Sequence, residues 1–106
     1  MSKWYILDDE NNPVPSTITE YLKWEESNPE KRIVKQEYIG DIRVSTVFLG
    51  LDHAWIGETP ILWETMIFGG EYDQYQVRYT SYDAALQGHE IALSLIKTNK
   101  DDEEII

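Results

Sequence analysis

Five side chains in this sequence belong to the types that support acid–base or metal chemistry. They are two imidazoles and three carboxylates: Asp52, His53, Glu64, His89 and Glu90. Such groups can together bind a divalent cation or share general acid and base roles. Their spacing gives little support, because the chain has only two histidines and neither an HxH nor an HExxH pattern. We therefore expect no catalytic residue, metal site or cofactor; the alternative is a small metal-dependent or acid–base enzyme built on the Asp52/His53 loop.

The loop that carries Asp52 and His53 also has a structural interpretation. An Asp side chain in a loop commonly accepts hydrogen bonds from backbone N–H groups a few residues away. Asp52 is expected to cap its own loop in this way, and His53 is expected to bond to the backbone.

Glu64 and His89 are expected to have partners inside the fold. Glu64 is the one charged residue in an apolar row of a predicted strand, and Arg43 or Arg78 on a neighbouring strand should pair with it. His89 lies at the edge of a helix face of small residues. That position favours a hydrogen-bonded packing histidine over a metal ligand.

The sequence has more aromatic residues than a small core needs. Four tyrosines surround the predicted turn at Gly69 and Gly70, and two tryptophans add to them: Tyr72, Tyr75, Tyr79, Tyr82, Trp55 and Trp63. Such rings can stack on a nucleobase or anchor a protein interface, and packing at the end of the sheet is the alternative. We predict a ligand- or partner-binding site at one end of the sheet, made of Asp52, His53, Trp55, Glu64, Tyr72, Tyr75, Arg78 and His89.

Two apolar segments must position these residues. Segments 44–49 and 61–68 are rich in β-branched and aromatic residues and are bounded by Gly or Pro, which predicts two central strands. Shorter strands are predicted at 3–7, 32–39 and 75–79. The predicted fold is α+β, a mainly antiparallel sheet of four to five strands with two helices on one face, in the order β-α-β-β-β-β-α. A second face carrying exposed tyrosines would favour a homodimer or a partner surface.

Two helices are predicted around the strands. The first begins at a capping box of Thr17 and Glu20 and ends near Asn28, because Pro29 restricts the residue before it. One face holds Ile18, Tyr21, Leu22 and Glu25, with Trp24 beside it, and the aromatic side is expected to point inward. The second helix is predicted from Tyr82 to about Lys97, where Gly88 allows close approach to the sheet.

The length and charge of the chain limit the number of domains and the kinds of partner that it is expected to have. The 106 residues fit a single domain, predicted at 1–99, with an acidic flexible tail at 100–106. A formal net charge of −11 disfavours direct binding to nucleic acid or to an anionic membrane. The chain has no cysteine and shows neither a signal-peptide pattern nor an apolar stretch that could span a bilayer. We therefore expect a cytoplasmic protein.

Three stretches resemble a known group of proteins. VSTVFLGLDH, ETMIFGG and YTSYDAALQGHE, at 44–53, 64–70 and 79–90, resemble a widespread family of small bacteriophage and prophage proteins. The resemblance covers nearly the whole chain, and the first third matches more loosely than the rest. It implies a viral origin and an accessory role toward the host, and it supplies no specific activity.

The expected function is a phage-derived, non-enzymatic binding protein. Such an anti-defence or host-modulating factor would sequester a small nucleotide-like ligand or block a host protein. One alternative is an acidic nucleic-acid mimic that inhibits a basic host protein. The mimic needs acids gathered in a stripe, but they are scattered except at 8–10 and 101–104.

Overall fold

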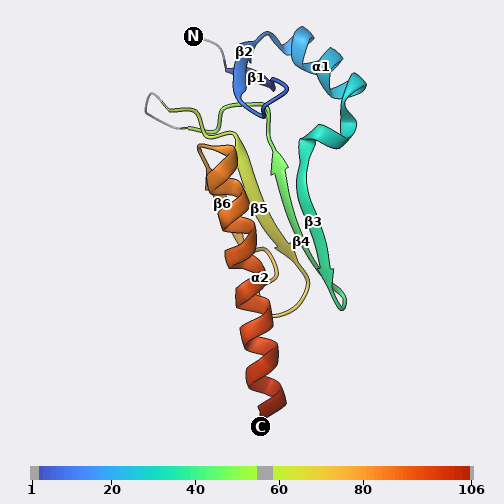
Figure 1. The fold of residues 1–106 in the computed structure, drawn as a ribbon, viewed down its shortest axis with the longest axis vertical. Coiled ribbons are helices and arrows are strands. Elements are labelled where there is room, and N and C mark those ends of the chain that lie inside the picture. Colours follow the sequence, from blue (N-terminus) through green and yellow to red (C-terminus); the bar gives the residue numbers. More distant parts are fainter. Residues whose placement is uncertain (1–2, 55–58, 106) are drawn as a thin grey trace.

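The computed structural model describes residues 3–54 and 59–105, with side chains up to residue 98. The elements follow in the order β1 (Trp4–Leu7), β2 (Pro13–Ser16), α1 (Ile18–Ser27), the 3₁₀ helix η1 (Pro29–Arg32), β3 (Ile33–Ile39), β4 (Ile42–Phe48), β5 (Trp63–Phe68), β6 (Gln76–Tyr79) and α2 (Tyr82–Ile105). Figure 1 shows α2 running along the sheet, with α1 and the β1–β2 hairpin gathered at one end.

The main sheet is an antiparallel meander of four strands in the order β3-β4-β5-β6. β1 and β2 form a separate two-stranded antiparallel sheet. The predicted α+β class, the mainly antiparallel pairing and the order of the elements are therefore confirmed. β4 and β5 are the central strands, as their β-branched and aromatic composition predicts.

Helix α2 packs on one face of the main sheet. Alternate side chains of the two central strands point toward it and are buried: Val44, Thr46, Phe48, Trp63, Thr65 and Ile67. Gly88 makes this close approach possible, because a Cβ there would overlap the Tyr79 ring and its hydroxyl. The predicted packing role of Gly88 is confirmed.

Helix α1 begins and ends as predicted. The Thr17 side chain accepts from the Glu20 N–H, the Glu20 carboxylate accepts from the Thr17 N–H, and Asn28 is the C-cap. Aromatic rings connect this helix to the sheet through contacts between Trp4, Tyr21, Trp24, Phe48 and Trp63. The aromatic side therefore points inward, while Ile18 and Leu22 stay 50% and 55% exposed.

Two local predictions differ from the structure. The first difference is strand β2, which lies in a stretch where the sequence predicts only a turn. Its two prolines argue against a strand, but antiparallel pairing with β1 stabilises one there. Helix α2 extends to Ile105, beyond the predicted end near Lys97 and through most of the predicted flexible tail. The sequence has no Gly or Pro after Gly88 to end the helix. No helix in the described part of the chain is long and apolar enough to span a membrane.

The face of the sheet turned away from α2 is here called the open face. Strand register places its side chains in rows across the strands: Tyr38, Arg43 and Phe68 in one, Gln36, Ser45, Met66 and Gln76 in the next, and Val47, Glu64 and Arg78 in the third. Among the described elements, α2 is the helix that makes extensive contact with the four strands, and it lies on the opposite face. Tyr38 is 63% exposed.

Candidate functional site

The loop residues Asp52 and His53 are engaged with the backbone. The Asp52 Oδ1 accepts hydrogen bonds from the N–H groups of Ala54 (2.8 Å) and Ile61 (3.0 Å). The His53 Nδ1 lies 2.7 Å from the Leu51 carbonyl oxygen, to which it donates. Both residues therefore hold the loop closed, as their structural interpretation predicts. Trp55, the third predicted residue of this loop, lies outside the described residues.

The predicted cross-strand pair of Glu64 forms with Arg78. The Arg78 Nε donates to the Glu64 Oε2 at 2.9 Å, and the Gln76 Nε2 donates to the same oxygen at 2.6 Å. The alternative partner, Arg43, instead places its guanidinium 4.3 Å from the centre of the Phe68 ring. Glu64 and Arg78 thus belong to the open face and are satisfied there by each other.

The two predicted tyrosines of the site lie at the other end of the sheet from Asp52. Tyr72 and Tyr75 follow β5 and pack against the core cluster of Val44, Ile67, Ala92, Leu93 and Ile96, on the side of α2. Asp52 and His53 precede β5, whose length separates the two groups (Figure 1). The expectation of one site at one end of the sheet is therefore wrong. Tyr79 and Tyr82 are partly buried and pack against the core, whereas Tyr38 is an exposed tyrosine of the open face.

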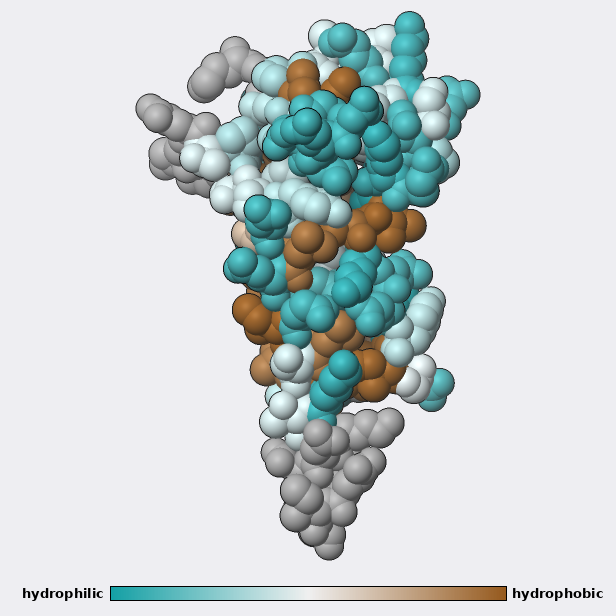
Figure 2. Space-filling model, in the orientation of Figure 1, coloured by the Kyte–Doolittle hydropathy of each residue, from teal (hydrophilic) through white to brown (hydrophobic). Residues whose placement is uncertain are grey.

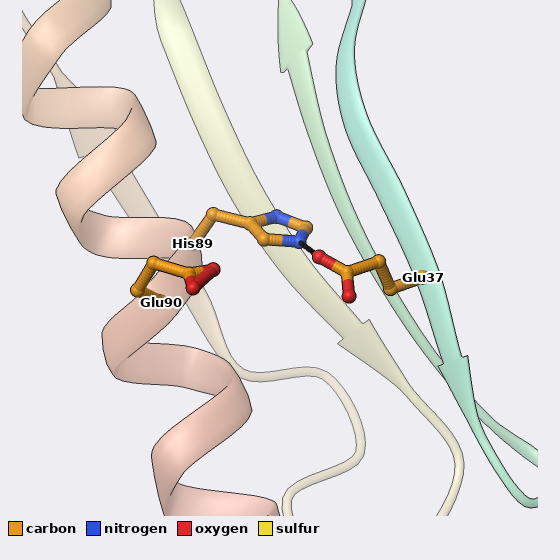
Figure 3. Close-up of side chains that lie close together, drawn as sticks. All are labelled: Glu37, His89 and Glu90. Carbon is orange, nitrogen blue, oxygen red and sulfur yellow. Dashed lines mark hydrogen bonds and ion pairs between the residues drawn. The ribbon is translucent and has the colours of Figure 1, made fainter.

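His89 is the centre of a polar network between α2 and the main sheet. Its ring is fully buried between α2 and the sheet. The Nδ1 lies 2.7 Å from the Thr46 hydroxyl, and the Nε2 lies 3.0 Å from the Glu37 Oε1. Thr46 in turn shares a hydrogen bond with Thr65, its register partner on β5. Figure 3 shows the imidazole reaching from α2 to Glu37 on β3, with Glu90 beside it on the helix.

The proton positions in this network follow from the charge state of His89. Burial lowers the pKa of His89, although the hydrogen bond that the ring donates to the Glu37 carboxylate acts in the opposite direction, so the imidazole is neutral at neutral pH. The arrangement in which every group is satisfied then has the Nε2–H donating to the Glu37 carboxylate and the Nδ1 accepting from Thr46. Thr46 accepts from the Thr65 hydroxyl. We assign this tautomer from the hydrogen-bond pattern.

At the surface end of the network, Lys35 forms ion pairs with Glu37 and Glu90. Its ammonium lies 3.3 Å from the Glu37 Oε1 and 3.4 Å from the Glu90 Oε2. Burial alone would raise the pKa of Glu37, but the hydrogen bonds from His89 and Lys35 and the charge of Lys35 together lower it. The hydrogen bond and charge of Glu37, with the charge of Glu90, raise the pKa of Lys35.

The same residues give the strongest candidate for a metal site. Within the described ranges, Glu37, His89 and Glu90 are the one group of three or more potential ligands whose atoms lie within 4.8 Å of one another. The Lys35 ammonium already contacts both carboxylates, so it supplies the positive charge that a cation would bring. The residues therefore fit an internal ion-pair network better than a metal site. Asp52, His53 and Glu64, the residues of the enzyme alternative, do not form such a group within the described ranges.

Thr46, His89 and Glu37 also have the composition of a hydroxyl–imidazole–carboxylate triad. A nucleophile of that kind must reach a substrate atom. Thr46, Thr65 and His89 are each 0% exposed, and α2 covers them. The Thr46 hydroxyl is therefore not accessible to an external molecule in this structure, and the network joins the helix to the sheet. The sequence does contain a signal for this buried network, because Thr46 and Thr65 are polar residues in the middle of the two predicted central strands.

Comparisons of the chain with protein-family models, with curated proteins and with solved structures find no significant match.

Proposed function

We propose that this chain is a non-enzymatic binding protein that docks on another protein through its open face. The observation that supports the proposal is the composition of that face. Its side chains include Tyr38, Arg43, Met66, Phe68 and Arg78, and among the described strand residues that form its rows there is no Lys or Asp. Tyr, Phe, Met and Arg are the residue types enriched in protein interfaces, where Lys and Asp are depleted. The Arg43 guanidinium also lies over the Phe68 ring, and this contact reduces the conformational entropy lost on binding.

Two further observations favour a protein partner over the other ligands considered. The four tyrosines expected to stack on a nucleotide-like molecule are partly buried and pack against the two core clusters: Tyr72, Tyr75, Tyr79 and Tyr82. The polar groups that would do chemistry are satisfied internally. In keeping with the resemblance to phage proteins, we propose an accessory protein that acts in the host cytoplasm by blocking a host protein.

Chemical cross-linking in host lysate, with identification of the cross-linked partner residues, tests this function. The wild-type chain and a Tyr38→Ala/Arg43→Ala variant are compared, and Ile91→Ser serves as the control, because Ile91 is an exposed apolar residue on α2. We expect one partner protein to be linked to the wild type and the control and lost from the open-face variant. Equal capture by all three would contradict the proposal.

Mass spectrometry of molecules released from the purified protein tests the sequestering alternative. We expect no nucleotide-like compound to be released in stoichiometric amount. A consistent release that survives the open-face substitutions would overturn the protein-docking function. If capture persists with the open-face variant but disappears at high salt, the acidic mimic becomes the better description, because its binding depends on unscreened charge.

A further inference from the structure

A groove lies where helix α1 meets the edge of the sheet. It has a volume of about 470 Å³ and is lined by Leu22, Glu25, Glu26, Pro29, Arg32, Ile33 and Val47. Val47 is also part of the open face, so the groove continues that face beyond the end of the third row. Leu22 and Ile33, which are 55% and 49% exposed, are among the large apolar residues that the described part of the chain leaves to solvent. Apolar side chains gathered in a groove mark interaction sites more strongly than ones scattered singly.

The groove is held in shape by Arg32. The Arg32 Nη1 donates to the Glu25 Oε1 at 3.2 Å, and its Nε donates to the Phe48 carbonyl oxygen at 3.4 Å. These two bonds connect α1 to β4 across the groove. A groove braced in this way needs little rearrangement on binding, which favours affinity.

The charges around the groove determine which kind of segment can bind there. Glu25 is paired with Arg32, whereas Glu26 is exposed and makes no side-chain hydrogen bond or ion pair within the described ranges. The free carboxylate adds to a chain whose formal net charge is −11. A cationic group beside an apolar side chain would therefore match the rim, and an acidic segment would be repelled.

We infer that this groove binds a segment of the partner protein that presents a bulky apolar side chain next to a Lys or Arg. The apolar side chain packs between Leu22, Ile33 and Val47, and the cation pairs with Glu26. The inference rests on the proposed function, since the groove extends the open face and would contact the same partner. It adds the chemical class of the segment that is recognised.

Selection from a random peptide library against the immobilised full chain tests this inference. We expect the enriched peptides to share a bulky apolar residue adjacent to Lys or Arg, and to shift the amide resonances of Leu22, Ile33 and Val47. The Leu22→Asp variant should bind them about tenfold more weakly or worse. Ile18→Asp is the matched control, because Ile18 is similarly exposed on the same helix and does not line the groove.

Two charge-reversal variants distinguish a specific ion pair with Glu26 from a general effect of the net charge. Glu26→Lys and Glu71→Lys change the net charge equally, and Glu71 lies in the turn after β5, away from the groove. We expect only Glu26→Lys to weaken the peptides, again by about tenfold. Equal loss in both variants would overturn the cation-pairing part of the inference.

The remaining outcomes count against the groove as a partner site. An acidic consensus, or peptides that bind Leu22→Asp as well as the wild type, would overturn the inference. So would self-association in sedimentation that Leu22→Asp abolishes, since a second copy would then be the occupant. A stoichiometric apolar small molecule released from the wild type and absent from Leu22→Asp would have the same effect. If cross-linked capture is lost with the open-face variant but unchanged in Leu22→Asp, the groove inference fails while the proposed function stands.

Discussion

The imidazole of His89 has different proton affinities in the folded and unfolded chain. Burial lowers its pKa in the fold, whereas the unfolded side chain titrates at about 6.5. Below that pH the unfolded chain binds more protons than the folded chain, so acidification favours unfolding. Glu37 and Lys35 face the ring from β3 and Glu90 is its neighbour on α2. The lowered pKa of Glu37 adds a second loss of stability only below about 4.5.

Urea unfolding between pH 5 and pH 7.5 measures this contribution. We expect the free energy of unfolding to fall as the pH drops below about 6.5. His89→Gln should be less stable at pH 7.5 by about 1–3 kcal/mol, the range for an unsatisfied buried polar group, and should depend less on pH. Parallel pH profiles for the wild type and His89→Gln would contradict this assignment.

Gly50 is a residue whose identity the packing requires. Its φ is +78°, and a Cβ at this position would overlap the Tyr21 ring. Gly50→Ala should lower stability by clearly more than the 1–2 kcal/mol of a left-handed backbone alone. Gly40→Ala is the control, because Gly40 has a φ of +60° and no heavy atom within 4 Å of the added Cβ. Equal losses in thermal unfolding would show that the Tyr21 contact contributes nothing.

Single-residue roles were predictable wherever the partner lies close in the sequence or on an adjacent predicted strand. Asp52 capping its loop and the Glu64–Arg78 pair are of this kind. The Glu37–His89 contact was not predictable, because its partners are separated by 52 residues and belong to elements whose relative placement is set by packing.

At the scale of elements, helix α1 shows what local signals can specify. Its capping box and its C-cap at Asn28 arise from side chains within one turn of each end. The outward position of Ile18 and Leu22 was not predictable, because it depends on α1 packing against β1 and the aromatic rings rather than on the broad face of the sheet. Strand β2 likewise exists through its pairing with β1.

The capping box makes a direct prediction about α1. Thr17→Ala removes the acceptor for the Glu20 N–H and should destabilise the protein by about 1 kcal/mol. Thr19→Ala, two residues later in the same helix, should be neutral or slightly stabilising, because Ala has the higher helix propensity. Chemical denaturation of the two variants distinguishes these outcomes. A loss for Thr19→Ala as large as that for Thr17→Ala would contradict the role of the cap.

At the scale of the whole molecule, charge opposes the fold. Twenty acidic residues against nine basic ones repel one another more strongly in the compact chain than in the unfolded chain. Salt shortens the range of this repulsion. We expect the melting temperature to rise as sodium chloride is increased from about 10 mM to 150 mM, where the Debye length falls to about 8 Å. A melting temperature that falls over this range would mean that the ion pairs outweigh the net repulsion.

The buried Thr65–Thr46–His89–Glu37 network has a consequence for how the molecule opens. It connects β5, β4, α2 and β3 through Thr65, Thr46 and His89, which are fully buried, and through Glu37, which is partly exposed. Lifting α2 away or shifting a strand by one residue would leave several of them without partners at once. Hydrogen exchange should therefore find the middle of α2 and the two central strands opening as one cooperative unit, with similar protection. The β1–β2 hairpin and α1 lie outside the four elements that this network connects, and they should exchange earlier.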